Sequence, residues 1–172
     1  TCTDINIGVD GTVNLTLGTV DVGGSRASMS MIAAEELGIP YEQVKANIAD
    51  TGSLGHNDMT EGSRGTFSSG MATIFAAREA IGVLKQRAAA MWGIPVEDVA
   101  WERGQAIAVG KTHNNLPPLS LQEIASKSGR TGGPIAGHNE VVADGAGMGF
   151  AAHICDVEVD KESGRSSIVR YT

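Results

Sequence analysis

Hydrophobic and polar residues alternate near the start of the chain, as they do in a β-strand with one buried face. Ile5 and Ile7 are flanked by polar or small residues, and a second alternating run, Val13 to Leu17, follows Asp10-Gly11. Asp-Gly is a favoured corner of two-stranded hairpins. Residues 4–18 are therefore predicted to form a β-hairpin.

Two longer stretches carry apolar residues at helical spacing. The first contains Met29 and Leu37 and stops at Gly38 and Pro40, which suit the end of a helix. The second runs from Phe67 to Trp92, contains no proline and is rich in alanine. Two main helices are expected.

The ends of these two helices have similar sequences. Leu37-Gly-Ile-Pro-Tyr-Glu-Gln-Val44 recurs as Trp92-Gly-Ile-Pro-Val-Glu-Asp-Val99. Each copy is predicted to end a helix, turn and begin a strand, the first strand covering residues 44–49. Two copies are too few for a solenoid.

The remaining elements have shorter signals. Ser120-Leu-Gln-Glu123 has the pattern of a capping box and predicts a helix to Lys127, whereas Gly129 to Gly133 is expected to be a loop. Further strands are predicted at 106–109 and 135–142. A C-terminal hairpin is predicted from apolar positions at 154–159 and 168–171 around a turn at 162–164.

Together these elements predict an α+β fold, a two-layer arrangement of a mixed sheet and two main helices, with N-terminal and C-terminal hairpins. Residues 1–172 are interpreted as a single fragment with two small lobes, about 1–100 and 101–172. The first residues include neither an initiator methionine nor a signal peptide, and the last lie within a strand pattern. We therefore expect the chain to be truncated at both ends.

Composition excludes several classes of protein. Lys and Arg number 13 against 20 Asp and Glu, and the resulting formal charge of −7 disfavours a nucleic-acid partner. Apolar residues make up 41% of the chain, without the run of roughly 20 that a membrane span needs. The two cysteines have no metal-site or disulfide spacing, which favours a reducing compartment, and a cytoplasmic location is expected.

A first candidate binding loop is Asp21-Val-Gly-Gly-Ser-Arg26, where a strand gives way to a helix. Gly23 and Gly24 let the backbone approach a ligand, and Ser25 is predicted to cap the helix. Free amides at such a helix start can bind an anion. The alternative is an ordinary strand-to-helix turn with a serine cap, which the local pattern alone favours.

A second candidate loop, Glu61-Gly-Ser-Arg-Gly-Thr66, precedes the long helix. Ser63, Arg64, Gly65 and Thr66 combine hydroxyl groups, a guanidinium and a residue without a side chain. The alternative is a loop that merely caps the helix, with Arg64 exposed. If the two loops meet in space, they would present donors to one extended phosphorylated ligand.

Other reactive residues carry weaker signals, and none is assigned a catalytic role. The histidines lack the spacing of a metal site, so a metal bound directly by protein is not expected: His56, His113, His138 and His153. Asp58 and Glu61 are interpreted as solvated carboxylates, and Cys155 as a small buried hydrophobe. Met29 and Met31 are interpreted as packing residues.

Five motifs follow one another in a recognisable order. They are Gly18-Thr-Val-Asp-Val-Gly-Gly-Ser25, Ile32-Ala-Ala-Glu-Glu-Leu-Gly-Ile-Pro40, Asp50-Thr-Gly, Gly62-Ser-Arg-Gly-Thr66 and Val157-Glu-Val-Asp-Lys-Glu-Ser-Gly164. In order and spacing the sequence resembles the molybdopterin-binding large subunit of the xanthine dehydrogenase and aldehyde oxidase family of molybdenum hydroxylases. The resemblance extends from about Ile5 to the end, so the chain is expected to be a fragment of a molybdenum cofactor-binding domain.

The resemblance implies roles for both loops, because in that family they contact the pterin dinucleotide and its phosphates. Those roles fall on Gly23, Gly24, Ser25, Ser63, Arg64, Gly65 and Thr66. The family's usual Gly-Gln-Gly motif has its glutamine beside the metal's oxo group, whereas this chain has Gly24 in that place. The family's glutamate base and its other cofactor-binding region have no counterpart in residues 1–172, so the fragment alone is expected to be inactive.

For the parent protein, the resemblance implies hydroxylation of a carbon centre of an aldehyde or N-heterocycle with oxygen from water. The implied cofactor is molybdenum–molybdopterin in a dinucleotide form, with iron–sulfur and FAD groups on partner domains or subunits. The implied partners are those domains or subunits and the remainder of the molybdenum-binding subunit.

Two other hypotheses about the function stay open. One is a non-catalytic assembly or interaction module on the same scaffold, suggested by Gly24 in place of glutamine. The other is an unrelated nucleotide-binding enzyme, which ranks last because no Walker lysine or ribose-binding acid stands at the required spacing.

Overall fold

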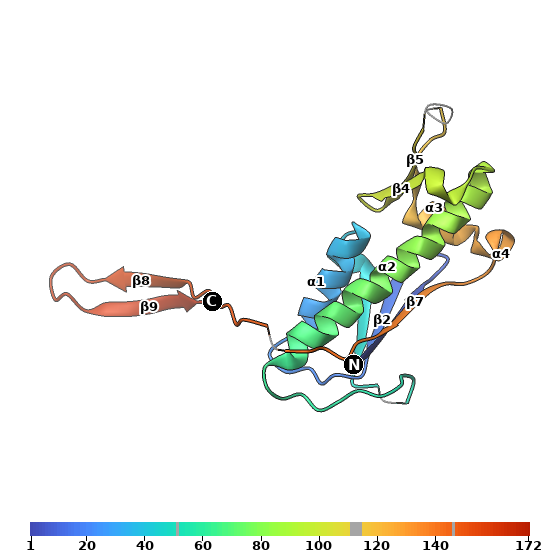
Figure 1. Ribbon diagram of the computed structural model, residues 1–172. Helices are drawn as coiled ribbons and strands as arrows, with labels where there is room; N and C mark the ends of the chain where they lie inside the picture. Colours follow the sequence, from blue (N-terminus) through green and yellow to red (C-terminus); the bar gives the residue numbers. More distant parts are fainter. Residues whose placement is uncertain (51, 111–114, 146) are drawn as a thin grey trace.

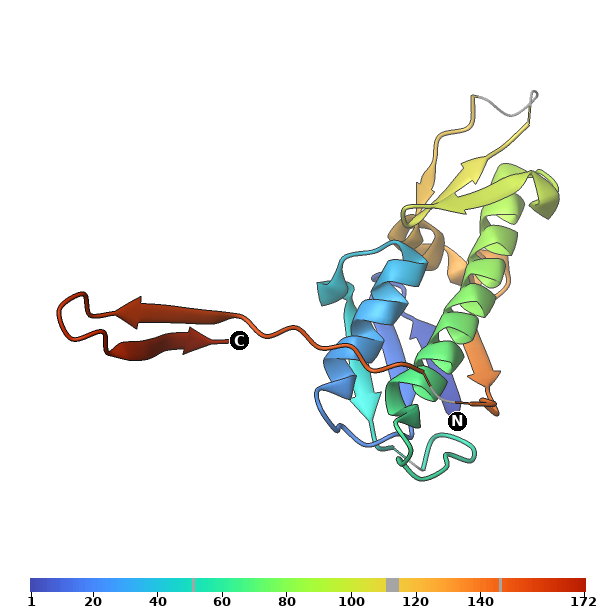
Figure 2. The ribbon, with the colours of Figure 1, turned by 60° about the vertical axis from the view of Figure 1, so that its left-hand side comes forward.

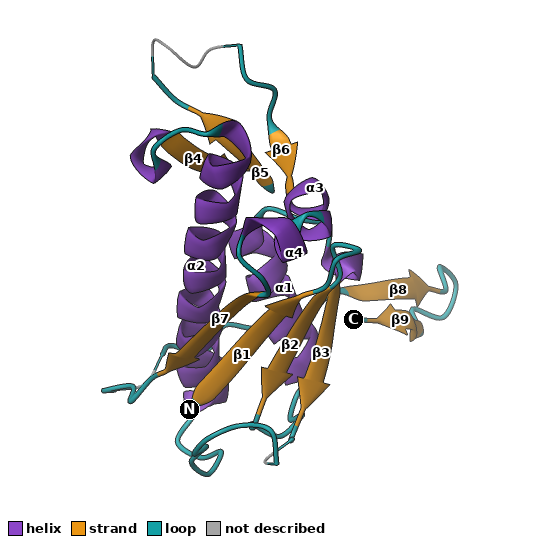
Figure 3. Ribbon diagram, turned by 90° about the vertical axis from the view of Figure 1, so that its right-hand side faces the viewer, coloured by secondary structure: helices purple, strands orange, loops and turns teal. Residues whose placement is uncertain are grey.

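The computed structural model describes residues 1–50, 52–110, 115–145 and 147–172. Its main sheet has four strands in the order β3-β2-β1-β7 (Figure 3). These strands are β1 (Cys2–Ile7), β2 (Val13–Leu17), β3 (Val44–Ile48) and β7 (Ile135–Glu140). β1 is antiparallel to β2 and β7, whereas β3 is parallel to β2. The predicted N-terminal hairpin is confirmed, and the sheet is mixed.

Two helices, α1 (Ser25–Leu37) and α2 (Arg64–Trp92), cover one face of this sheet (Figures 1 and 2). The core between the layers contains strand residues such as Ile5, Leu15 and Ile135 and helix residues such as Met29 and Leu84, all of them buried. Burial of apolar surface on this scale is the dominant favourable term in folding. The predicted α+β fold, with a mixed sheet and two main helices, is confirmed.

A smaller sheet lies beside the C-terminal end of α2 (Figure 3). It consists of β4 (Val99–Glu102), β5 (Gln105–Ala108) and β6 (Leu119–Ser120), and α3 (Leu121–Ser126) follows β6. Ser120 and Glu123 form the predicted capping box at the start of α3, with the Ser120 amide donating to Glu123 Oε2 at 2.8 Å. Two amides at the start of α3 are thereby satisfied.

The prediction of a loop from Gly129 to Gly133 is wrong in part, because α4 (Ser128–Thr131) forms one helical turn there. Its last carbonyl has a partner on α2, since Arg87 Nη1 donates to Thr131 O at 2.8 Å. A bond between residues so far apart in the chain cannot be read from local sequence.

The repeated motif folds the same way twice. α1 and α2 each end at a glycine in the left-handed region, Gly38 with φ 72° and Gly93 with φ 70°. A 3-10 turn follows each helix, η1 (Tyr41–Gln43) or η2 (Val96–Asp98), and leads into β3 or β4. Glycine suits these C-caps because it has no Cβ to clash at positive φ. The predicted helix-turn-strand units are confirmed.

The C-terminal hairpin projects away from the two-layer body (Figures 1 and 2). Its strands, β8 (Cys155–Val159) and β9 (Ser166–Tyr171), are antiparallel as predicted, and every residue in them is exposed. Val157 pairs with Ile168, whereas Glu158 pairs with Ser167. Because side chains alternate across a strand, one face of the hairpin is apolar and the other is polar.

Two side chains differ from the sequence interpretation. Met31 is exposed, although Met29 is buried, because residues two apart on a helix point in different directions. Cys155 is exposed rather than buried, because the apolar face of the hairpin has no covering layer among the described residues.

Strand β7 lies after residue 100 and nevertheless pairs with β1, so the main sheet contains strands from both sides of the predicted lobe boundary. The division into two lobes and the truncation at both ends stay predictions. Among the described residues, no helix combines the length and hydrophobicity needed to cross a membrane.

Candidate functional site

The two glycine loops lie at the same end of the helical layer. α1 and α2 pack side by side, and both helices start at that end (Figure 2). A Cβ at Gly70 would lie 3.2 Å from Ile32 Cδ1, a contact about two turns into each helix. Just before the loops, Thr19 Oγ1 lies 3.4 Å from Thr60 Oγ1. The loops are therefore neighbours, as the hypothesis of one shared ligand requires.

Both loops enter their helix through two consecutive residues in the left-handed region. Gly23 and Gly24 have φ of 63° and 77°, and Gly62 and Ser63 have φ of 55° and 58°. Gly24 and Ser63 are the N-caps. Gly24 has no side chain, and the Ser63 side chain makes no capping hydrogen bond. A left-handed residue followed by a helical one lines up successive amides, which makes a concavity for anions. Ser63 has a Cβ, so this left-handed conformation is strained, and strained residues of this kind often occur at functional sites.

The prediction that Ser25 caps α1 is wrong. Gly24 occupies the N-cap position, and Ser25 is the first helical residue. The Ser25 hydroxyl donates instead to the carbonyl oxygen of Val20 at 2.9 Å. It therefore holds the chain that leaves β2 rather than an amide of the helix.

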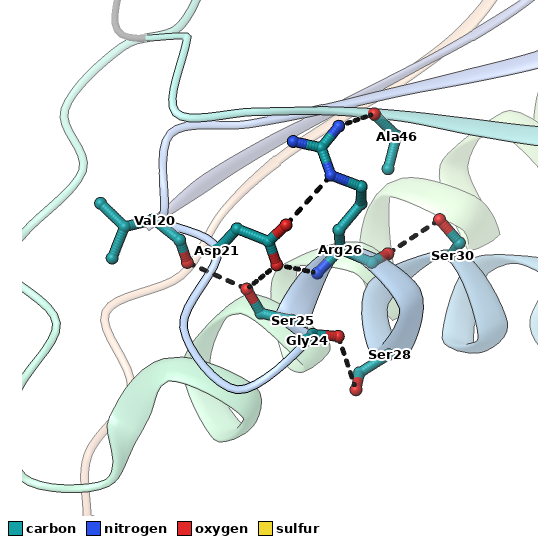
Figure 4. A network of polar contacts seen from close by, with 8 residues as sticks. All are labelled: Val20, Asp21, Gly24, Ser25, Arg26, Ser28, Ser30 and Ala46. Carbon is teal, nitrogen blue, oxygen red and sulfur yellow. Dashed lines mark hydrogen bonds and ion pairs between the residues drawn. The ribbon is translucent and has the colours of Figure 1, made fainter.

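Asp21 connects the first loop to α1 and, through Arg26, to β3 (Figure 4). Asp21 Oδ1 accepts from the Arg26 amide at 2.9 Å, and Asp21 Oδ2 accepts from Arg26 Nε at 3.1 Å. Arg26 Nη1 in turn donates to Ala46 O on β3 at 3.1 Å. These bonds, the backbone amide of Arg26 first, lower the pKa of Asp21 and keep its carboxylate ionised.

Arg64 is partly buried and paired, so the alternative in which it is exposed is wrong. Its side chain is 23% exposed, with Nη1 2.5 Å from Asp58 Oδ2 and Nη2 3.4 Å from Thr1 Oγ1. The Arg64 hydrogen bond lowers the pKa of Asp58, which is an ion-pair partner and not only a solvated carboxylate. A guanidinium has five N–H donors, so Arg64 keeps others for a ligand.

Ser63 and Thr66 line a hollow of about 480 Å³ at the start of α2. Residues 147–150 and Phe67 form its other walls, and a Cβ at Gly147 would lie 3.2 Å from Phe67 Cδ2. Gly65 lies between the two hydroxyl residues in the first turn of α2. The hollow thus combines hydroxyl groups and helix amides with an aromatic wall.

Residues 147–150 are absent from the sequence-based site, although they line this hollow. Three residues shortly before them, also absent from the sequence-based site, line a second hollow of about 360 Å³ next to the second loop. The residues around the second hollow are Asp58, Glu61, Gly62, Arg64, Ser68, Val142, Ala143 and Gly145. The sequence signal that could have identified these residues is a run of closely spaced glycines, Gly145, Gly147 and Gly149, because the two loops are also rich in glycine.

The residues present fit a phosphorylated ligand. A Cβ at Gly23, Gly24 or Gly62 would meet nothing within 4 Å, so the backbone borders open space at all three positions. Helix-start amides, hydroxyl groups and a guanidinium are the donors that phosphates use in proteins.

Metal binding by the side chains themselves has no support in the described part of the chain. No group of three or more His, Cys, Asp or Glu residues there could hold a metal ion. His113 lies outside the described residues. His138 is engaged elsewhere, because its ring pairs with Asp4 across β1 and β7.

Comparison with known proteins gives one family and a consistent set of relatives. The family model described as "Molybdopterin cofactor-binding domain" matches residues 1–172. The carbon monoxide dehydrogenase large chain of Hydrogenophaga pseudoflava is 24% identical over 171 residues, which cover 98% of this chain and 21% of that protein.

Solved structures agree with this match. A Cu,Mo-CO dehydrogenase in its carbon monoxide reduced state is 25% identical with a TM-score of 0.75, over 99% of this chain and 22% of that one. The reconstituted CO dehydrogenase from Oligotropha carboxidovorans gives the same values. Quinoline 2-oxidoreductase from Pseudomonas putida 86, at 18% identity and a TM-score of 0.64 over the same shares, has the same fold. The chain therefore spans about a fifth of the length of these relatives.

Proposed function

The chain belongs to the molybdopterin cofactor-binding domain family, and from this we propose that it forms one wall of the cofactor site in the large subunit of a molybdenum hydroxylase. The observation that carries the proposal is the meeting of two glycine loops at parallel helix starts, each with left-handed residues before the helix. Neither loop alone would reach along an extended cofactor. Together they offer donors along its length.

In this proposal the two loops bind and orient the cofactor, in a dinucleotide form. Backbone amides next to Gly23, Gly24 and Gly65 approach it closely, because no Cβ stands in the way. Side-chain donors come from Ser63, Arg64 and Thr66, whereas Ser25, whose hydroxyl donates to Val20 O, contributes its backbone amide. When bound, the cofactor supplies the redox chemistry that oxidises a carbon centre of the substrate, and the protein supplies orientation, electrostatics and exclusion of water.

Residues 1–172 contribute no acid, base or nucleophile to the reaction in this proposal. The isolated fragment is therefore expected to be inactive. Electrons would leave through iron–sulfur and flavin partners, and the whole protein would work in the cytoplasm.

Arg64→Ala in the full-length subunit is expected to lower the retention of molybdenum and pterin at least about tenfold, since a hydrogen bond to a charged group contributes about 1.5–3 kcal/mol. Ser63→Ala is expected to lower it less, because one neutral donor is lost. The measurement is bound molybdenum and released pterin per subunit after gel filtration.

Arg78→Ala is the matched control, because Arg78 is also an ion-paired arginine on α2, with Nε 2.6 Å from Glu36 Oε1. Normal loading in Arg64→Ala and Ser63→Ala would remove the assigned roles. A wild-type subunit that binds no molybdenum would favour the interaction module instead.

We also propose that the apolar face of the β8–β9 hairpin packs against the remainder of the large subunit. Val157, Val159, Ile168 and Tyr171 on that face are 52–66% exposed. The opposite face carries an ion pair, with Arg170 Nη2 2.8 Å from Asp156 Oδ2. Apolar side chains gathered on one face of a hairpin normally pack on another layer.

Ile168→Asp in the full-length subunit is expected to reduce the yield of folded protein and lower its unfolding temperature by several degrees. A charge there would lose the burial of an isoleucine, about 1.5–3 kcal/mol, and would need desolvation. Ser167→Asp is the matched control, because Ser167 is the neighbouring residue on the polar face. Equal behaviour of the two variants would contradict the proposed packing.

A further inference from the structure

In the described part of the chain, the main sheet ends at β3 on one side and at β7 on the other (Figure 3). An edge strand presents unpaired N–H and C=O groups, with which a strand of another molecule can pair. Natural proteins block such edges with charged side chains or with covering elements. The outward backbone groups of β3 and β7 therefore decide whether this sheet is open to a further strand.

At the β7 edge, a carboxylate binds an amide that an added strand would use. The Val141 amide donates to Thr1 O at 2.9 Å and thus points towards β1. Backbone groups of successive residues point to opposite sides of a strand, so those of His138 point away from β1. Glu79 on α2 accepts from the His138 amide, with Oε2 at 3.1 Å. His138 lies near the middle of β7, so the block is central.

At the β3 edge, a guanidinium binds an outward carbonyl. The Ala49 amide donates to Thr19 O at 3.1 Å, on the β2 side. The same alternation turns the carbonyl of Ala46 away from β2, and Ala46 is the middle residue of β3. Arg26 on α1 donates from Nη1 to Ala46 O at 3.1 Å (Figure 4). Each edge is therefore closed at its centre by a side chain from a helix.

The two edges are blocked in the same way. Each charged side chain comes from the helix that packs against that strand, and its sign matches the backbone group, with an anion on an N–H and a cation on a C=O. Glu79 and Arg26 are exposed, so water solvates both charges. A strand added at either edge would displace the charged group or remove its water, and burial of an unpaired charge is unfavourable.

We propose that Glu79 and Arg26 keep the main sheet at four strands by blocking its edges against a strand from a second copy of the chain. At the β7 edge, the excluded pair is β7 against β7 in antiparallel orientation, a self-complementary contact of the kind that twofold dimers use. Such pairing would bring the Glu79 carboxylates of both copies to one junction, where like charges repel. The proposal is independent of the proposed function, because it involves no cofactor contact.

The test uses the β7 edge of the full-length subunit, because Arg26 also bonds to Asp21 in the first loop. Glu79→Ala removes the carboxylate, whereas Glu79→Lys replaces it with a charge that cannot accept a hydrogen bond. Glu36→Ala is the matched control, because Glu36 is a helix glutamate that accepts from Arg78 Nε at 2.6 Å instead of from a strand. Light scattering after gel filtration measures the size of the assemblies, and the unfolding temperature is the fold control.

Glu79→Ala is expected to raise the fraction of subunits in assemblies larger than the wild-type one at least about tenfold, because no charge then opposes pairing. Glu79→Lys and Glu36→Ala are expected to match the wild type, since lysine is itself a common block on edge strands. In Glu79→Ala, new protection from hydrogen exchange is expected at the outward amides of Ala136 and Glu140. Assemblies of Glu79→Ala no larger than those of the wild type, or equal association of Glu79→Lys and Glu79→Ala, would contradict the proposal.

Hydrogen exchange on the wild-type subunit tests the same edge without a substitution. The outward amides of Ala136 and Glu140 are expected to exchange at least about tenfold faster than the inward amide of Gly137, which faces β1. The His138 amide is expected to exchange more slowly than these two outward amides, because Glu79 accepts from it. Equal protection of outward and inward amides would show that another strand already pairs with β7, and would overturn the proposal.

Discussion

Gly137→Ala is expected to unfold or severely destabilise the protein. Gly137 lies in β7 where the strand crosses α2, and a Cβ there would lie 2.0 Å from Ala76 O and 2.7 Å from Ala80 N. Both are backbone atoms of a helix, so neither can rotate aside. β7 would have to move away from α2, which costs about 3 kcal/mol or more for an overpacked core site. At roughly 2–4 °C per kcal/mol for a chain of this size, the melting temperature would fall by about 6–12 °C.

Gly82→Ala is the matched control for this prediction. Gly82 lies within α2, and a Cβ there would meet nothing within 4 Å. Alanine in a helix interior is more stable than glycine by roughly 0.5–1 kcal/mol, so this variant is expected to melt slightly higher than the wild type. Thermal unfolding followed by circular dichroism measures both. A Gly137→Ala protein as stable as Gly82→Ala would show that β7 and α2 are not in contact.

Gly38→Ala is expected to have the next largest effect on stability. Gly38 has φ 72°, and its Cβ would lie 2.5 Å from the amide nitrogen of Gly104 in the turn between β4 and β5. The left-handed conformation costs a non-glycine residue roughly 1–2 kcal/mol, and the backbone clash raises the total to about 3 kcal/mol. Denaturant unfolding gives the change in free energy.

Gly93→Ala separates the two contributions, because Gly93 is the equivalent C-cap in the repeated motif. It has φ 70°, and a Cβ there would meet nothing within 4 Å. Only the conformational cost of roughly 1–2 kcal/mol is expected. If both variants lost the same free energy, the approach of Gly38 to Gly104 would be irrelevant to stability.

The sequence was informative wherever a feature depends on neighbouring residues. The Asp10-Gly11 corner, the glycine C-caps and the Ser120 capping box each involve a few consecutive residues, and all three are confirmed. The family resemblance read from the loop motifs is confirmed as membership of the molybdopterin cofactor-binding domain family. The individual cofactor contacts stay predictions.

Several of the errors arose where a residue far along the chain decides the outcome, whereas the wrong cap at Ser25 was a local error. α4 depends on Arg87 of α2, and the paired state of Arg64 depends on Asp58 and on Thr1, which lies 63 residues away. Cys155 alternates with polar residues like a buried strand residue, yet its face is uncovered among the described residues. Periodicity shows which face is apolar, but it does not show what covers that face.

For the candidate site, the local pattern was sufficient to identify two loops that can approach a ligand, because glycine, hydroxyl and arginine residues before a helix are visible in consecutive positions. Their meeting at one end of the helical layer, and the use of the α1 donors by Asp21, depended on how the chain folds. Side-by-side packing of α1 and α2 on a mixed sheet brings together residues about forty positions apart. Contacts over such a separation arise from burial of shared apolar surface, which no short stretch of sequence specifies.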